Sequence, residues 1–179
     1  MKKTLCLVGK SGTGKTTIAN KLKEHGFSSI DSFTTRPRRF ENEGGHIFVS
    51  PKEFDALRGD LVAYTMFDGY EYGATKQQFE KNDVYIIDPA GIYELIENVG
   101  RENLIIVYIT ALDGIRFERM KKQRGVKQAF ERIKHDEVKF AAFTEFDIAL
   151  ENNSPSDLER NIKRLMYIMN IGRLNEGDE

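Results

Sequence analysis

The sequence predicts a single α/β domain in which helices flank a parallel β-sheet. Three apolar runs have the length and composition of buried strands, and helical segments lie between them: Thr4 to Val8, Val84 to Asp88 and Leu104 to Ile109. Strands that alternate with helices in this way build parallel sheets covered by helices. A chain of 179 residues, 40% of them hydrophobic, is long and apolar enough for one sizeable core.

A glycine-rich segment directly follows the first strand. Residues 9–16 read Gly-Lys-Ser-Gly-Thr-Gly-Lys-Thr and fit the phosphate-binding pattern G-x-x-x-x-G-K-[ST], with every fixed position filled. In such a loop, backbone N–H groups converge on phosphates, Lys15 reaches the β and γ oxygens, and Thr16 holds magnesium. A helix from Lys15 to about His25 points its positive end at the same anion, which favours this interpretation over a plain turn. The expected residues of this nucleoside triphosphate site are Gly9, Ser11, Gly12, Thr13, Gly14, Lys15, Thr16 and Thr17.

The alternation of strand and helix is interrupted after residue 32. A helix begins after Ser50, because Ser50-Pro51-Lys52-Glu53 combines a capping box with proline at the first helical position. We interpret residues 33–75 as an insertion carrying a second substrate site, and residues 1–32 and 76–179 as the core. Short extended pieces and a turn are expected within the insertion: His46 to Val49, Leu61 to Phe67 and the turn Asp68-Gly69.

The rest of the chain returns to helical and strand patterns without an internal repeat or a low-complexity linker. The tail from Asn175 to Glu179 is expected to fray. Helical patterning predicts four further helices: Gly91 to Asn98, Asp113 to Gln123, Gln128 to Ala141 and Ser156 to Asn170.

Composition excludes several classes of function. A formal charge of -1 provides no global field for nucleic acid or an anionic membrane. No stretch approaches the roughly 18 apolar residues of a membrane span, and no long apolar targeting segment follows the first residues. The single cysteine, Cys6, lies within the first apolar strand, where disulfide or metal chemistry is not expected. We therefore expect a cytoplasmic protein without nucleic-acid or membrane partners.

Asp88 is the candidate for a second magnesium-side group. It ends an apolar strand, where a carboxylate would lie near the phosphate-binding loop. Its position before Pro89 also fits a simple turn-starting aspartate. The candidate metal residues are thus Thr16 and Asp88.

Further motifs follow the phosphate-binding loop Gly9 to Thr16: Thr34-Thr35-Arg36, Arg39, Phe48-Val49-Ser50, Phe54 and Tyr72-Gly73. In this order and at nearly these distances, the motifs resemble the guanylate kinase family, from the first strand through the final helix. The resemblance implies a P-loop kinase core, a small acceptor-binding insertion and an arginine-bearing lid at about residues 124–130. It also implies transfer of the γ-phosphoryl group of ATP to a nucleoside monophosphate, GMP or dGMP.

The resemblance assigns the acceptor's phosphate to Arg36, Arg39 and Tyr72. Guanidinium groups bind phosphate bidentately, and a phenol adds a directed donor. By themselves the arginines would fit only a nonspecific anion patch, and Arg38 is interpreted as a solvated surface charge. His46 stands where the family has another phosphate-contacting tyrosine, so it is either a donor to phosphate or an unliganded strand residue.

The base-contacting positions depart from the family. Ala63 and Ala74 replace a glutamate and a hydroxyl residue that contact guanine, whereas Ser32 matches a base-contacting serine. Thr65, on the same strand face as Ala63, and Thr75 offer neutral donors and acceptors instead. Losing the buried carboxylate should remove most guanine discrimination. The candidate substrate-binding residues are Ser32, Arg36, Arg39, His46, Ala63, Thr65, Tyr72, Ala74, Thr75 and Asp88.

Arginines around Gly125 form the candidate lid. Arg124 and Arg132 match lid arginines of the family, and together with Lys15 and Arg39 they are the candidate catalytic residues, because they would stabilise charge on the transferred phosphoryl group. Arg116 is interpreted instead as helix-surface charge.

The last predicted strand resembles the family's final core strand. It runs from Phe146 to Leu150 and is followed by Asn152, which matches a nucleotide-side asparagine.

The implied reaction is direct in-line transfer without a nucleophilic side chain, because the acceptor phosphate is already anionic. The altered base-contacting positions leave another nucleotide, or a phosphorylated sugar such as ribose bisphosphate, open as the acceptor. A guanylate kinase-like binding or regulatory module without catalysis is a further alternative, although such modules typically have degraded P-loops and Lys15 and Thr16 are intact here.

Overall fold

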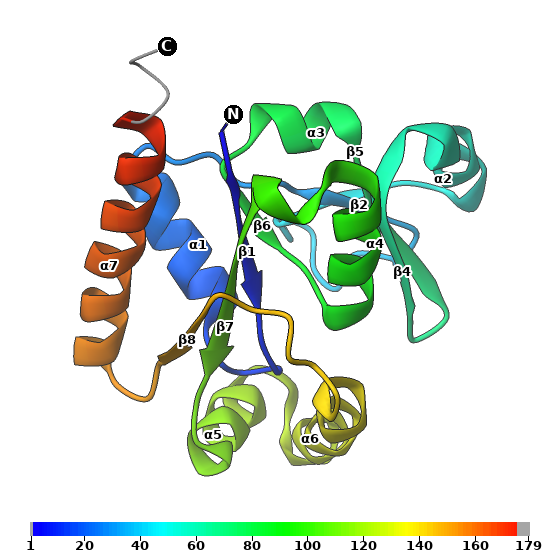
Figure 1. Cartoon of the computed structure of the whole chain (residues 1–179). Coiled ribbons are helices and arrows are strands. Elements are labelled where there is room, and N and C mark those ends of the chain that lie inside the picture. Colours follow the sequence, from blue (N-terminus) through cyan, green and yellow to red (C-terminus); the bar gives the residue numbers. More distant parts are fainter. Residues whose placement is uncertain (1, 175–179) are drawn as a thin grey trace.

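The computed structural model describes residues 2–174 and consists of two four-stranded sheets with helices packed around them (Figure 1). The predicted tail, Asn175 to Glu179, lies outside the described residues. Within residues 2–174, no helix has both the length and the apolar character needed to cross a membrane.

The first sheet is entirely parallel and has the strand order β6-β1-β7-β8. Its central strand β1 pairs with β6 through Leu5 and Val84, and with β7 through Leu5 and Ile105. The fold class predicted from the alternating pattern is thereby confirmed. The strands of this sheet are β1 (Thr4–Val8), β6 (Val84–Ile86), β7 (Leu104–Thr110) and β8 (Ile148–Glu151).

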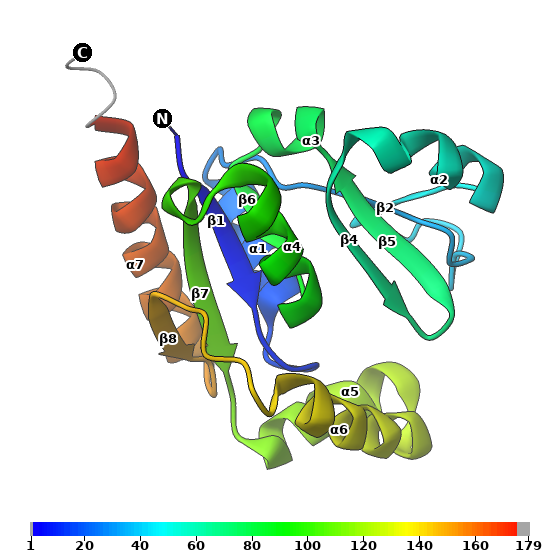
Figure 2. The same ribbon diagram turned by 45° about the vertical axis from the view of Figure 1, so that its right-hand side comes forward.

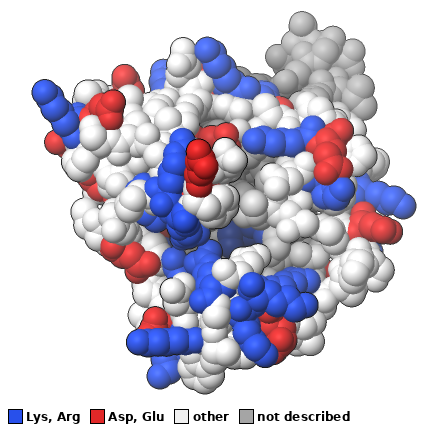
Figure 3. Space-filling view, turned by 180° about the vertical axis from the view of Figure 1, so that it is seen from behind, with Lys and Arg blue, Asp and Glu red and all other residues white. Residues whose placement is uncertain are grey.

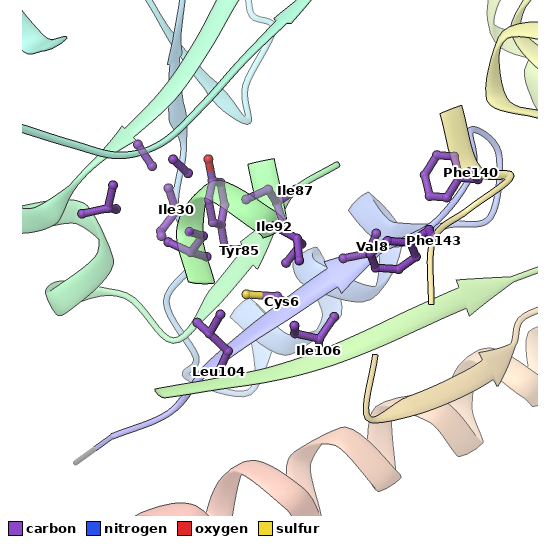
Figure 4. Close-up of a cluster of buried hydrophobic side chains, with 14 residues drawn as sticks. Cys6, Val8, Ile30, Tyr85, Ile87, Ile92, Leu104, Ile106, Phe140 and Phe143 are labelled. Carbon is purple, nitrogen blue, oxygen red and sulfur yellow. The ribbon is translucent and has the colours of Figure 1, made fainter. Parts of the chain in front are cut away.

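Helices cover both faces of this sheet (Figure 1). Alternate residues of β1 point to opposite faces. Leu5 and Leu7 pack with α1 (Lys15–Glu24) and α7 (Pro155–Leu174) on one face. Cys6 and Val8 pack on the other face (Figure 4), in a cluster that includes Ile92 and Leu95 of α4 (Pro89–Val99).

The second sheet has the strand order β3-β2-β5-β4 and lies to the side of the first (Figure 1). β2 pairs parallel with β3, whereas β5 pairs antiparallel with both β2 and β4. The predicted turn joins β4 to β5, with φ values of 51° at Asp68 and 77° at Gly69. The strands are β2 (Ser32–Thr34), β3 (His46–Phe48), β4 (Leu61–Phe67) and β5 (Tyr70–Thr75).

Two short helices accompany the second sheet. The helix α2 (Pro51–Leu57) begins with the predicted capping box at Ser50 and Glu53. The helix α3 (Lys76–Lys81) was not expected, although Thr75 and Gln78 form a second capping box at its start. Short 3₁₀ turns at Arg58–Asp60 and Arg101–Asn103 precede β4 and β7.

Two consecutive helices lie at the carboxyl end of β1 and β7 (Figure 2). Only Gly125, with a φ of 81°, separates α5 (Asp113–Arg124) from α6 (Val126–Phe140). A positive φ favours glycine, so this residue permits an abrupt change of direction between the helices. Ligands bind at this edge in open α/β sheets, which directs attention to the space around α5 and α6.

Candidate active site

The segment after β1 has the geometry of a phosphate-binding loop. Gly12 and Gly14 have φ values of 78° and 96°, which side chains rarely adopt. A Cβ atom at Gly12 would also lie 2.8 Å from the carbonyl oxygen of Arg116. Glycine is therefore required here by both backbone conformation and close packing, and the loop leads directly into the N-terminus of α1.

Lys15 folds back across this loop. Its Nζ donates to the carbonyl oxygens of Gly9 at 2.5 Å and Lys10 at 3.1 Å. Burial lowers the pKa of Lys15 to about 8, although the nearby Asp136 carboxylate opposes the shift. Lys15 is therefore already in place beside the loop, and its poorly compensated positive charge favours binding of an anion.

One cavity opens on the α1 side of Lys15, and we call it the donor cavity. Thr16 and Thr17 line it from the first turn of α1, and Arg119 lines it from α5. Asn152 donates to the carbonyl oxygen of Thr13 at 2.8 Å, while its buried Oδ1 has no hydrogen-bond partner within the described chain. A buried acceptor without a partner is costly, so the site suits a ligand with an N–H donor, such as an exocyclic amine.

A second cavity, the arginine cavity, gathers the predicted phosphate-binding and lid arginines. Arg36, Arg39, Arg124 and Arg132 all line it. Burial and the neighbouring arginines lower the pKa values of Arg39 and Arg124. Holding these positive charges close together therefore costs free energy. Lys and Arg side chains also gather around a hollow on the face shown in Figure 3. The geometry of the arginine cavity favours a multiply charged anion.

Glu43 fixes the orientation of Arg36. The Nη1 and Nη2 atoms of Arg36 donate to the two carboxylate oxygens at 3.2 and 2.8 Å, and the backbone N–H of Arg39 donates to the same carboxylate at 2.7 Å. These hydrogen bonds lower the pKa of Glu43 to about 2. Arg36 is 8% exposed, and its Nε has no partner within the described chain. The guanidinium is thus held rigidly with one buried donor left for a ligand.

A third cavity, the central cavity, lies between the phosphate-binding loop, the second sheet and α6. Ser32, His46, Thr65, Tyr72 and Asp88 line it, together with Lys15. The hydroxyl of Ser32 and the Nδ1 of His46 form a 3.0 Å hydrogen bond. Burial and the charge of Arg36 lower the pKa of His46, which favours the neutral imidazole. Five of the ten predicted substrate residues therefore meet here.

Three other predicted substrate positions do not reach the central cavity. Ala63 and Ala74 are 1% and 0% exposed and belong to the hydrophobic core. Thr75 is engaged as the N-cap of α3, where its hydroxyl accepts from the N–H of Gln78. β4 and β5 thus turn these three residues toward the core and the start of α3, away from the central cavity, and their assignment as substrate contacts stays a prediction.

Arg116 is not a surface charge, and that prediction was wrong. Its side chain is 1% exposed and donates to Asp136 at 2.8 Å and to the carbonyl oxygen of Ser11 at 2.9 Å. Asp136 in turn accepts from the N–H of Ser11 at 2.6 Å. A helical pattern alone suggested solvent exposure, whereas the return of α6 against α5 buries this arginine in an ion pair that holds the phosphate-binding loop. Arg38 is exposed as predicted, and its Cζ atom lies 4.2 Å from the centre of the Phe48 ring.

The two candidate metal residues line different cavities. Thr16 is exposed and lines the donor cavity, whereas Asp88 lines the central cavity, where Lys139 donates to it at 2.5 Å. Asp88 is also the N-cap of α4, since it accepts from the N–H of Gly91 at 2.8 Å. Among residues 2–174, no group of three or more His, Cys, Asp or Glu side chains could hold a metal ion by itself. A magnesium ion would therefore depend mainly on ligands from a bound triphosphate and water.

Sequence reasoning missed Glu43, Asp136 and Lys139. On α6, Asp136 lies four residues after Arg132, and Lys139 lies three residues after Asp136. These three side chains therefore form one polar face of the helix. That spacing was a usable signal, since all three line the central cavity. Glu43 gave no comparable signal, because its pairing with Arg36 depends on the path of the loop between β2 and β3.

Comparisons with known proteins agree on one family. The family model described as guanylate kinase matches residues 1–170. The guanylate kinase of Streptomyces kasugaensis is 28% identical over an alignment covering 89% of this chain and 84% of that protein. The guanylate kinase of Anaplasma phagocytophilum is 34% identical over 59% of this chain and 56% of that protein. A crystal structure of guanylate kinase from Anaplasma phagocytophilum superimposes with a TM-score of 0.61 and 23% identity, covering 95% of this chain and 85% of that one, which supports the fold.

Proposed function

The chain belongs to the guanylate kinase family, and from this premise we propose that it transfers the γ-phosphoryl group of ATP to the phosphate of GMP or dGMP. One observation carries the proposal: four arginines from the loop after β2 and from α5 and α6 line a single cavity, which shares Arg124 with the donor cavity and Arg132 with the central cavity. These are Arg36, Arg39, Arg124 and Arg132. Guanidinium groups in this number fit an acceptor phosphate together with the phosphoryl group that it receives.

The acceptor phosphate is bound by groups that are already oriented. Glu43 holds Arg36 with its Nε free, and Tyr72 lies in the adjacent central cavity. Binding such a rigid donor set costs little ordering entropy. The acceptor oxygen is anionic, so catalysis proceeds through positioning and charge stabilisation, and no side chain needs to act as a general base.

Lys15 lies where the two substrates would meet, because it lines both the donor cavity and the central cavity. In this proposal its ammonium group leaves the carbonyl oxygens of Gly9 and Lys10 and binds the β and γ phosphates of ATP. Arg39, Arg124 and Arg132 then stabilise the charge that is spread over the transferred group.

ATP is proposed to bind with magnesium. The exposed hydroxyl of Thr16 fits as its protein ligand on the donor side, and Asp88 stays a predicted second group. When bound, the ion neutralises part of the charge on the donor phosphates. The cytoplasmic location and the absence of nucleic-acid partners also stay proposals, based on the near-neutral charge and the single buried cysteine.

The proposal is tested by measuring magnesium-dependent ADP formation from ATP with a panel of ribo- and deoxyribonucleoside monophosphates and ribose phosphates. We expect GMP and dGMP to support turnover, and Lys15→Ala to lower it by about 100-fold or more. Lys23→Ala, an exposed change on the same helix, is the matched control and should retain full activity.

Three outcomes would count against the proposal. ADP formation that is indifferent to every acceptor would indicate a nucleotide-driven switch. Turnover of a phosphorylated sugar alone would indicate the sugar-phosphate alternative. Silence across the panel would indicate a binding module, an alternative that the names of the relatives do not favour.

A further inference from the structure

Lys139 extends from α6 into the central cavity, which Arg132 of the same helix also lines. Its Nζ lies 2.5 Å from Oδ2 of Asp88 and 4.7 Å from the centre of the Phe67 ring. Thr65 donates to the same Asp88 oxygen at 3.1 Å. Lysine, aspartate and threonine therefore form one connected polar group, contributed by α6, by the N-cap of α4 and by β4.

The remaining hydrogen-bonding capacity of this group consists mainly of donors. An ammonium group has three N–H donors, and within residues 2–174 the Nζ of Lys139 hydrogen-bonds only to Asp88. Oδ2 of Asp88 already accepts from Lys139 and Thr65, and Oδ1 accepts from Gly91. A ligand in the cavity thus meets two available N–H groups on Lys139 and a carboxylate that is largely occupied.

The position of Lys139 fits the base of the acceptor rather than its phosphate. Arg36, Arg39 and Arg124 line the arginine cavity and not the central cavity of Lys139, whereas Arg132 lines both. The part of the cavity around Lys139 has Phe67, Tyr85 and Phe140 on its walls. Aromatic walls with a few directed polar groups suit a planar ring.

We propose that Lys139 recognises the acceptor's base by donating to O6 and N7 of a 6-oxopurine. This inference rests on the proposed function, because it assigns the base-binding part of the same acceptor site. Guanine presents O6 and N7 as adjacent acceptors, whereas adenine places an amino donor beside N7 and would oppose the ammonium group. Lys139 would thus recognise the base in place of the glutamate whose position Ala63 occupies.

A specific consequence is tolerance of the purine 2-position. Few carboxylate oxygens can accept from an N2 amino group here, since Ala63 lies in the core and the two carboxylates lining the cavity are occupied. Asp88 accepts from Lys139, Thr65 and Gly91, and Asp136 accepts from Ser11 and Arg116. Inosine monophosphate, which has O6 and N7 but no 2-amino group, should therefore bind nearly as well as GMP. A site that recognised guanine through a dedicated carboxylate would instead reject it.

The test measures equilibrium binding by titration calorimetry without ATP, using GMP, IMP, 7-deaza-GMP and AMP. We expect GMP and IMP to bind within about threefold of each other, and 7-deaza-GMP and AMP to bind about 10-fold or more weakly. Lys139→Met should bring the ratio of the AMP and GMP dissociation constants close to one. Lys139→Arg should preserve the ratio, because guanidinium also donates bidentately to O6 and N7. Lys134→Met removes an exposed charge from the same helix and should change nothing.

The ratio of dissociation constants separates base recognition from general attraction to phosphate, which affects all four ligands equally. The inference is overturned if IMP binds more than about tenfold weaker than GMP, if Lys139→Met leaves the ratio unchanged, or if none of the purine monophosphates binds. The analogue series uses the unmodified protein, so it tests the preference for O6 and N7 even if Lys139→Met misfolds, and Lys139→Arg then tests the role of Lys139. Base-selective binding without phosphoryl transfer would contradict the proposed function and leave this inference intact.

Discussion

At the scale of single residues, Glu43 has the clearest predicted effect. It fixes Arg36 by two charge-assisted hydrogen bonds, and Glu43→Gln would weaken both. We expect the KM for the acceptor to rise about tenfold with kcat little changed, because binding must then order the arginine. Steady-state kinetics at saturating ATP measure the effect, and Glu41→Gln is the exposed control. An unchanged KM would show that the pairing is dispensable.

Glu43 also predicts a dependence of stability on pH. Its pKa is lowered from 4.5 to about 2 in the folded protein. Its contribution is therefore fully present above about pH 4.5 and is lost as the pH falls toward 2. We expect wild type to exceed Glu43→Gln in the free energy of unfolding by on the order of 2 kcal/mol at pH 7, and by much less at pH 3. Chemical denaturation at both pH values measures this difference, and a constant difference would contradict the assignment.

Lys15 predicts a different pH effect, on binding of ATP. Burial lowers the pKa of Lys15 to about 8, and a bound triphosphate favours the charged form. Above about pH 8 the free protein loses this proton, so binding must take it up again, and affinity should fall by up to about tenfold per pH unit. Titration calorimetry in buffers of different ionisation enthalpy reports the proton uptake. Lys15→Arg should show none, since arginine stays protonated.

At the scale of elements, the Arg116–Asp136 pair joins α5, α6 and the phosphate-binding loop. Removing Arg116 leaves the buried Asp136 without its ion-pair partner, so Arg116→Met should destabilise the protein by about 3–5 kcal/mol. Asp136→Asn should cost less, because Arg116 keeps an ion pair with Asp113. The double variant should cost much less than the sum, because neither charge remains. Unfolding of all four proteins gives the coupling energy. Additive losses would mean that the two side chains stabilise the protein independently.

The same elements show which parts of the fold were predictable. Local signals located the capping box of α2, the turn at Asp68-Gly69 and the strand β4. The strand from Val84 was predicted two residues too long, because Asp88 caps α4 instead of ending β6. Neither β5 nor α3 was assigned, since the alternation of β5 is short and α3 has only six residues.

At the scale of the whole molecule, the candidate site combines segments that are distant in the sequence. The phosphate-binding loop was predictable because its residues are consecutive. Arg36, Arg39, Arg124 and Arg132 were assigned through resemblance, and the structure brings them to one cavity. The burial of Arg116 depends on how α6 packs back against α5, which no local pattern encodes. The spacing of Arg132, Asp136 and Lys139 marks a polar face of α6, but the cavity that this face lines is set by the packing of the whole molecule.

The arrangement of cavities predicts that the two substrates promote each other's binding. Arg124 lines both the donor cavity and the arginine cavity, so either ligand orders the same side chain and reduces the cost for the other. We expect GMP to bind about 5–50-fold more tightly when ADP is present, and ADP to gain by the same factor. Calorimetric titration of each ligand in the presence of the other measures this coupling without turnover. Arg124→Gln should abolish most of it, whereas Arg160→Gln, an exposed change on α7, should leave it intact. Independent binding in the wild type would mean that the two cavities do not communicate through Arg124.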